Sequence, residues 1–97
     1  MKLWIDDIRT APEGYTWCKT VKSAIDTIIF NRNIIEVIDI DNDAGDYAFD
    51  GGDYIKVLDW LEYMGYNYPI HIHTMNPVAR RNMEQICRKN NWTILYI

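Results

Sequence analysis

The sequence predicts an α/β protein, a three-layer sandwich in which about three helices cover both faces of a mostly parallel five-stranded sheet. Short apolar, β-branched runs alternate with amphipathic runs of helical period, the order expected of parallel strands joined by helical crossovers. Three of the apolar runs also end in polar side chains. The length of 97 residues fits a single domain with one core.

The composition narrows the classes of function. A formal net charge of −4 argues against an extended nucleic-acid groove, which needs clustered Lys and Arg, but it allows a small phosphorylated ligand if a cation mediates. No apolar run approaches the roughly 20 residues of a membrane span. Cys18 and Cys87 lack metal-ligand spacing and indicate reduced thiols, so we expect a cytoplasmic protein.

The first two strands are expected close together in the sequence. Leu3–Ile5 forms the first strand, Pro12 and Gly14 mark a loop, and Tyr15–Lys19 forms a short second strand. The connection has no helical period and is shorter than the dozen or so residues of a usual parallel crossover. We therefore expect the second strand at the edge of the sheet.

The first helix should begin after Thr20, a good N-cap, and end at residues 31–33. The central strand then covers about Ile35–Asp41. The apolar positions of the helix follow the i, i+3, i+4 rule: Val21, Ala24, Ile25, Ile28 and Ile29.

The second half of the chain repeats the alternation. After a loop over residues 45–52, Asp53 is expected to cap a second helix that stops at Gly65. Ile70–His73 is a further strand, and Asn76 is the expected N-cap of a third helix with Pro77 at its first position. Thr93–Ile97 closes the chain as the last strand.

Carboxylates follow the first and the central strand. Asp39 and Asp41 share one face of a strand, so Asp39 would be partly buried and needs a cation or hydrogen-bond donors. Crowded carboxylates favour a hard cation such as Mg²⁺, and parallel strands deliver their tips to one sheet edge. Asp6 and Asp7, after the first strand, and Asp43 complete the predicted acidic pocket.

Basic groups are expected beside this pocket. His71 and His73 share a face, which permits a zinc pair, although one packed histidine and one site histidine is the commoner arrangement. Arg80 and Arg81 lie early in the third helix, where the helix dipole and guanidinium groups favour an anion. The spacing from Asp39 also imitates an EF-hand, but it lacks the required glycine and final glutamate.

Five segments form a recognisable combination: Leu3-Trp-Ile-Asp-Asp-Ile-Arg9, Pro12-Glu-Gly-Tyr15, Asp41-Asn-Asp-Ala-Gly45, His73-Thr-Met-Asn-Pro-Val-Ala-Arg80 and Asn82-Met83. Together they resemble the cyclic-phosphate-processing receiver-like domains, small relatives of the response-regulator receiver domain. The resemblance spans nearly the whole chain. It implies a flavodoxin-like sheet of order 2-1-3-4-5 and a role in sensing or hydrolysing cyclic phosphates, as RNA ends or cyclic nucleotides.

The resemblance also implies roles for individual residues. It makes Asp6, Asp7 and Asp41 ligands of Mg²⁺ or another hard divalent cation. It makes His73, Asp41 and Asp43 the catalytic groups, and Arg9, Asn76 and Arg80 the ligand-binding groups. One position departs from the family pattern: Asn42 stands where the family has a histidine, and an amide does not shuttle protons at neutral pH.

Three functions stay open at this point. The first is a metal-dependent phosphodiesterase in which His73 moves a proton. The second is a module that captures a phosphorylated ligand without turnover, which Asn42 favours. The third, ranked last, is a phosphoacceptor receiver with Asp41 phosphorylated, because the last strand lacks the lysine that such domains need.

Overall fold

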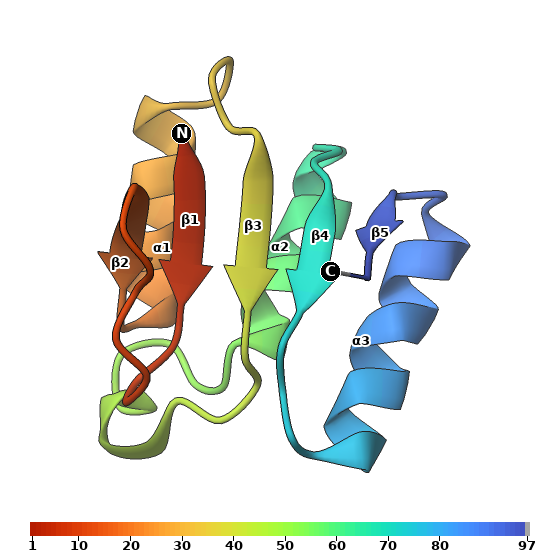
Figure 1. Ribbon diagram of the computed structural model, residues 1–97. Helices are drawn as coiled ribbons and strands as arrows, with labels where there is room; N and C mark the ends of the chain where they lie inside the picture. Colours follow the sequence, from red (N-terminus) through yellow and green to blue (C-terminus); the bar gives the residue numbers. More distant parts are fainter. Residues whose placement is uncertain (97) are drawn as a thin grey trace.

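The computed structural model describes residues 1–96 as an all-parallel sheet with three α-helices (Figure 1). The strand order β2-β1-β3-β4-β5 confirms the expected receiver-like arrangement. The strands are β1 Lys2–Ile5, β2 Tyr15–Cys18, β3 Val37–Ile40, β4 Ile70–Ile72 and β5 Ile94–Leu95. The helices are α1 Val21–Phe30, α2 Ile55–Met64 and α3 Pro77–Lys89, with a short 3₁₀ turn, η1, over Gly45–Tyr47.

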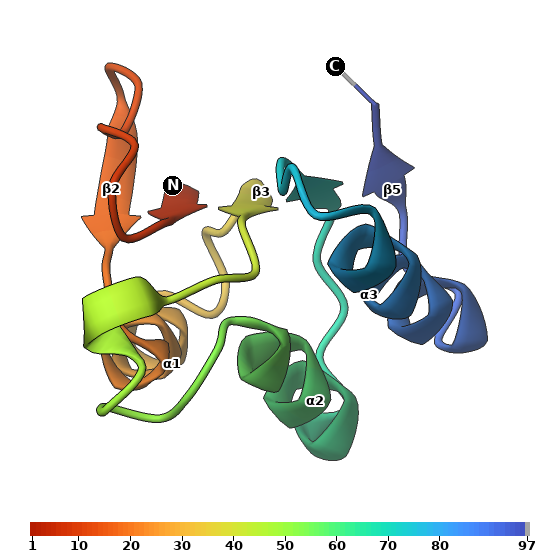
Figure 2. The ribbon, with the colours of Figure 1, turned by 90° about the horizontal axis from the view of Figure 1, so that it is seen from below.

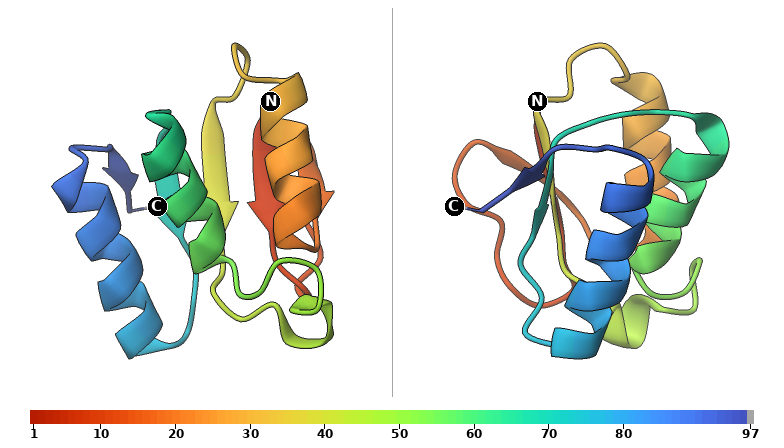
Figure 3. Two further views of the ribbon diagram at one scale, coloured as in Figure 1. Left: turned by 180° about the vertical axis from the view of Figure 1, so that it is seen from behind. Right: turned by 90° about the vertical axis from the view of Figure 1, so that its right-hand side faces the viewer.

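All three helices cover the same face of the sheet (Figures 2 and 3), so the expectation of a three-layer sandwich is wrong. Strand order explains the difference. From β2 to β3, β4 and β5 the chain always moves across the sheet in one direction, and right-handed crossovers then place α1, α2 and α3 on one side. Only the step from β1 to β2 runs the other way, and residues 6–14 make it without a helix.

The core lies between the helices and the covered face of the sheet. Leu3, Ile5, Ile38 and Ile40 point into it from alternate strand positions and are fully buried. From α1, Val21, Ala24 and Ile28 are buried in the core and Ile25 packs against it, and α3 contributes Met83. Ile29, also expected on the inner face of α1, is instead exposed. No helix within residues 1–96 is long and apolar enough to cross a membrane.

The helix ends confirm most of the expected signals. Thr20 forms a capping box with Ser23, Asn76 caps α3 ahead of Pro77, and Gly65 ends α2 in the left-handed conformation. Asp53 does not cap α2, since the N-cap position is Tyr54 and makes no side-chain cap. The Asp53 carboxylate instead accepts a hydrogen bond from the backbone N–H of Ala44, at 3.0 Å.

The opposite face of the sheet carries aromatic and polar side chains. Trp4, on β1, packs edge-on against Tyr15 of β2, and its indole N–H donates to the carbonyl of Arg9 in the loop between the two strands. Arg9 in turn donates from Nη1 to the carbonyl of His73, at 3.2 Å. These contacts fix the loop over the helix-free face, where Figure 3 shows it in profile.

Candidate functional site

The candidate site lies at the carboxyl ends of β1, β3 and β4, where the strands point downward in Figure 1. In the sheet register Trp4, Asp39 and His71 are neighbours on the helix-free face. Backbone pairing continues beyond the strands, because the N–H of Asp41 donates to Ile5 and the N–H of His73 to Ile40. Two residues beyond the first row, a second row on the same face therefore consists of Asp6, Asp41 and His73.

His73 lies between two buried carboxylates. Its Nε2 is 2.8 Å from Oδ2 of Asp6, and its Nδ1 is 2.5 Å from Oδ1 of Asp39. The ring stacks on Trp4, with centroids 4.0 Å apart and planes 6° from parallel. Only 8% of the His73 side chain is exposed, so its position and orientation are set on every side.

The carboxylates determine the protonation of this cluster. Burial acts to lower the pKa of His73, but the hydrogen bonds to Asp39 and Asp6 outweigh it and raise the pKa above the ordinary value. Burial likewise acts to raise the pKa of Asp6, yet hydrogen bonds from two backbone N–H groups and His73 together lower it. The raised pKa favours the protonated form of His73, in which both nitrogens donate and neither offers a lone pair to a metal.

His71 has a different environment. Its Nδ1 is 2.9 Å from Oδ1 of Asp39, so the same carboxylate oxygen orients both histidines. Among residues 1–96 the hydrogen bonds of the His71 ring involve Nδ1 alone, and the side chain is 18% exposed. A zinc site built on the two histidines is disfavoured, because carboxylates occupy both ring nitrogens of His73.

The acidic residues divide into a clustered set and an outer one. Asp6, Asp41 and His73 each place a potential ligand atom within 4.8 Å of the others. Asp41 also accepts a hydrogen bond from the N–H of Asn42, at 2.7 Å. Asp43 is exposed, bonds to the side-chain amide of Asn42 and lies outside this group.

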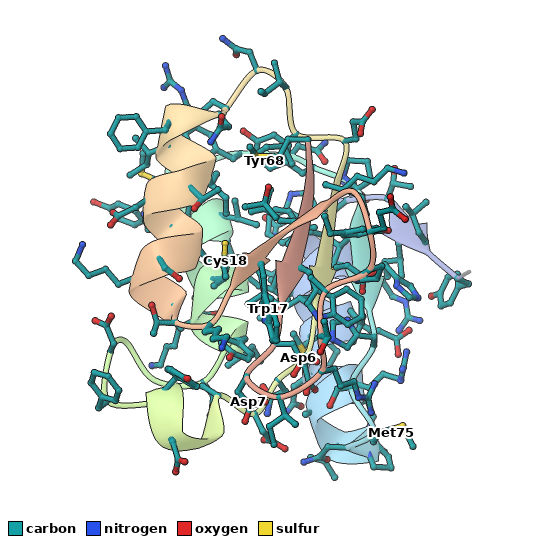
Figure 4. All side chains as sticks on the ribbon, turned by 60° about the vertical axis from the view of Figure 1, so that its left-hand side comes forward. Asp6, Asp7, Trp17, Cys18, Tyr68 and Met75 are labelled. Atoms are coloured by element: carbon teal, nitrogen blue, oxygen red, sulfur yellow. The ribbon has the colours of Figure 1, made fainter. Side chains whose placement is uncertain are left out.

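Asp7 is held against the loop after β3. Burial, and less strongly the carboxylates of Asp6 and Asp41, raise the pKa of Asp7, as expected of carboxylates that share a small space. Gly45 has a φ of 54°, and a Cβ there would overlap Oδ2 of Asp7. Figure 4 shows Asp6 and Asp7 at the end of β1 below Trp17, whose indole N–H donates to the Asp6 carbonyl.

This donor set fits a hard divalent cation. Carboxylate oxygens are the ligands that Mg²⁺ prefers. The carboxylate of Asp6 already takes part in three hydrogen bonds, whereas those of Asp41 and Asp7 take part in fewer and have more room for a cation. The glycine at position 45 makes room for the second of these carboxylates. In such a site Asp6 would not bind the cation directly. Its carboxylate, bonded to His73, would add negative charge nearby.

The predicted ligand-binding residues are near the site but are partly engaged. Oδ1 of Asn76 accepts from the N–H groups of Val78 and Ala79 as a helix cap. Arg80 donates from Nη2 to the carbonyl of Thr74, at 3.0 Å. Arg80 and the two histidines line one hollow of about 260 Å³. A second hollow of about 280 Å³, at residues 29–34, holds none of the candidate residues.

A parallel sheet of order 2-1-3-4-5, with paired carboxylates after β1 and another after β3, defines a receiver-like domain. Residues 1–89 match the family model of the cyclic-phosphate processing receiver domain, and the chain belongs to that family. No curated protein shows a significant match to the chain, and no solved structure does.

Trp4 carried no role in the sequence prediction, and it supplies the surface on which His73 stacks. Asp39 was expected to be partly buried and to need a cation or hydrogen-bond donors, and its partners are the rings of His71 and His73. The sequence did hold a sign that Asp39 meets the histidines. Asp39 and Asp41 share one face of their strand, as His71 and His73 do of theirs, and on neighbouring strands such residues can meet. The partner of Trp4 depended on strand order and was not visible in its own segment.

Proposed function

We infer that this chain is a Mg²⁺-dependent domain that binds a cyclic phosphate, at an RNA end or in a cyclic nucleotide, and supports its hydrolysis. The observation that carries the proposal is the meeting of Asp6, Asp41 and His73 within 4.8 Å at the strand ends, in a chain of this family. Acidic and cationic groups thereby adjoin, as the binding of a metal together with a phosphate requires.

Asp7 and Asp41 are the residues that would hold the cation. When bound there, Mg²⁺ would polarise a phosphate oxygen and offset the repulsion between the carboxylates and the ligand. The loop over residues 41–45 positions Asp41 and leaves the space that Asp7 uses.

The remaining residues supply positive charge. Arg9 and Arg80 donate to neighbouring carbonyls, Arg9 to that of His73 and Arg80 to that of Thr74, the residue that follows. His73 lines the same hollow as Arg80, and hydrogen bonds to both of its ring nitrogens hold it in place. Its two engaged nitrogens make it better suited to stabilising charge than to carrying protons.

Capture without turnover is the second candidate function. Asn42 in place of the family histidine and the locked ring of His73 both favour it, since each removes a proton carrier from the pocket. The two buried, unbridged cysteines agree with the cytoplasmic location that we also propose.

One experiment tests the proposal. The chain is titrated calorimetrically with 2′,3′-cyclic and 3′,5′-cyclic nucleotides and with an RNA carrying a 2′,3′-cyclic phosphate end, with Mg²⁺ or EDTA, and products are separated by chromatography. We expect Mg²⁺-dependent binding and a monoester product. Binding without product would establish capture, and no binding by any of the three ligands would refute the cyclic-phosphate function.

A further inference from the structure

The hollow beside β4 and β5 is a second place where charged groups converge, and it adjoins the acidic edge through His73. Its volume is about 260 Å³, slightly below the roughly 300 Å³ at which pockets for drug-sized ligands begin. It is therefore suited to a small group rather than a whole nucleotide. Its polar lining comes from His71, His73, Arg80 and Tyr96, and its apolar lining includes Leu95.

His71 is preorganised toward this hollow. The buried carboxylate of Asp39 fixes its Nδ1, at 2.9 Å, and this leaves Nε2 as the ring nitrogen available to a ligand. With a proton on each nitrogen, His71 donates one hydrogen bond to Asp39 and has a second to offer an anion. His73 lines the same hollow, but both of its nitrogens are already committed.

Arg80 reaches the hollow from α3. A single hydrogen bond from Nη2 to the Thr74 carbonyl anchors its guanidinium, and the side chain is partly buried. The other N–H groups of the planar fork are of the kind that bind phosphate in a bidentate way. Arg81, the next residue, is exposed and does not line the hollow.

The acidic groups near the hollow are already paired. Asp39 lies behind His71 and also bonds to His73. Glu84 accepts from Arg88 at 3.1 Å and from the hydroxyl of Tyr96 at 3.2 Å. Arg80 forms no ion pair among residues 1–96, so its positive charge stays available for an anion in the hollow.

We propose that this hollow binds the phosphate group of the ligand, against Nε2 of His71 and the guanidinium of Arg80. The ligand's identity rests on the proposed function, whereas the oxyanion site itself does not. The phosphate lies beside the ring of His73, which lines the same hollow. His71 becomes a ligand-contacting residue.

The test follows the ring nitrogens of both histidines by ¹H–¹⁵N NMR while the chain is titrated with inorganic phosphate and, separately, with a 2′,3′-cyclic nucleotide. Sodium chloride at equal ionic strength is the control. We expect both ligands to shift the Nε2 signal of His71 most. Arg80→Ala should weaken binding at least tenfold and Arg81→Ala less than twofold. Arg80→Lys, which keeps the charge but not the fork, serves if Arg80→Ala does not fold.

The outcomes separate this proposal from the proposed function. A cyclic nucleotide could bind without shifting the Nε2 signal of His71, with Arg80→Lys and Arg80→Ala binding it as the parent does. That result would refute phosphate binding in the hollow and leave the proposed function intact. Phosphate binding at His71 without any cyclic-nucleotide binding would support the hollow and refute the function. No shift at His71 with either ligand would overturn the hollow outright.

Discussion

Nε2 of His73 and Oδ2 of Asp6 lie 2.8 Å apart although 67 positions of sequence separate the two residues. This contact ties the end of β4 to the end of β1, across β3, in a region where both side chains are almost fully buried. On its other side the same ring meets Asp39. His73 is therefore part of what holds the carboxyl edge of the sheet together.

The first prediction is that His73→Gln lowers the free energy of unfolding by about 3 kcal/mol, the lower end of the cost of removing one partner from a buried ion pair. Asp6 and Asp39 would be left facing each other without a cation between them. His71→Gln should cost less, about 1 kcal/mol, because it removes one hydrogen bond from a more exposed ring. Urea denaturation at pH 7 measures both, and equal losses would contradict the assignment.

The second prediction concerns pH. The pKa of His73 is raised in the folded state, so the folded protein holds this proton more tightly than the unfolded chain does. The resulting stability is fully present below the unfolded value of about 6.5 and is lost as the pH rises through the folded pKa. In EDTA, the free energy of unfolding should fall above pH 6.5. The His73→Gln variant should be flatter over the same range, and parallel curves would contradict the prediction.

The sequence predicted the elements well because their signals are local. Thr20, Asn76 and Pro77 act on the backbone within a few residues, and alternation along the strands is equally local. The cap at Asp53 failed for a non-local reason, since its carboxylate bonds to the loop after β3. The helix-free face was implied by strand order and the right-handed crossover rule, although the helical pattern alone did not reveal it.

The site was predictable in position but not in its bonding. Apolar strands that end in Asp6, Asp41 and His73 brought these residues to one edge as expected. Which nitrogen of which histidine meets which carboxylate depends on three strands at once. That is why His71, expected only to pack, has the nitrogen that His73 lacks.

The third prediction is that Mg²⁺ stabilises the folded protein through Asp41. Because ligand binding to the folded state alone adds RT ln(1 + [L]/Kd), a concentration a hundredfold above Kd should add about 2.7 kcal/mol and raise the melting temperature. Asp41→Asn should abolish the rise. Asp43→Asn, an exposed position outside the cluster, is the matched control and should keep it. A melting temperature that ignores millimolar Mg²⁺, Mn²⁺ and Ca²⁺ in the parent would argue against a metal site.

The fourth prediction uses two glycines with similar backbones. Gly45 and Gly65 have φ values of 54° and 71°, so alanine at either position costs about 1 kcal/mol in backbone strain. Only at Gly45 would the new Cβ also overlap the Asp7 carboxylate, whereas nothing lies within 4 Å at Gly65. Gly45→Ala should therefore weaken the stabilisation by Mg²⁺, and Gly65→Ala should not. An equal Mg²⁺ response in both variants would remove Asp7 from the metal site.

The last prediction distinguishes the two histidines in turnover of a 2′,3′-cyclic phosphate. In hydrolysis, the oxygen of a water molecule bonds to phosphorus, one bond from phosphorus to a ribose oxygen breaks, and the water proton must leave while the ribose oxygen gains one. With Nδ1 held by Asp39 and an Nε2–H directed at the phosphate, His71 is placed to give that proton to the ribose oxygen, while the water proton leaves to solvent.

General acid–base catalysis of this kind is typically worth about 10² to 10⁴ in rate, so His71→Gln should lower kcat by at least a hundredfold. Its melting temperature should fall by only about 4–8 °C, the shift that a loss of about 1 kcal/mol gives in a domain of this size. His73→Gln should show the reverse, with a clear loss of stability and, at a temperature where it is folded, a smaller loss of kcat, because its ring contributes charge and not proton transfer. The measurement is single-turnover cleavage beside thermal unfolding for both variants. If His73→Gln loses the larger share of kcat while His71→Gln cleaves as fast as the parent, the proton is carried by His73 and the assignment to His71 is wrong.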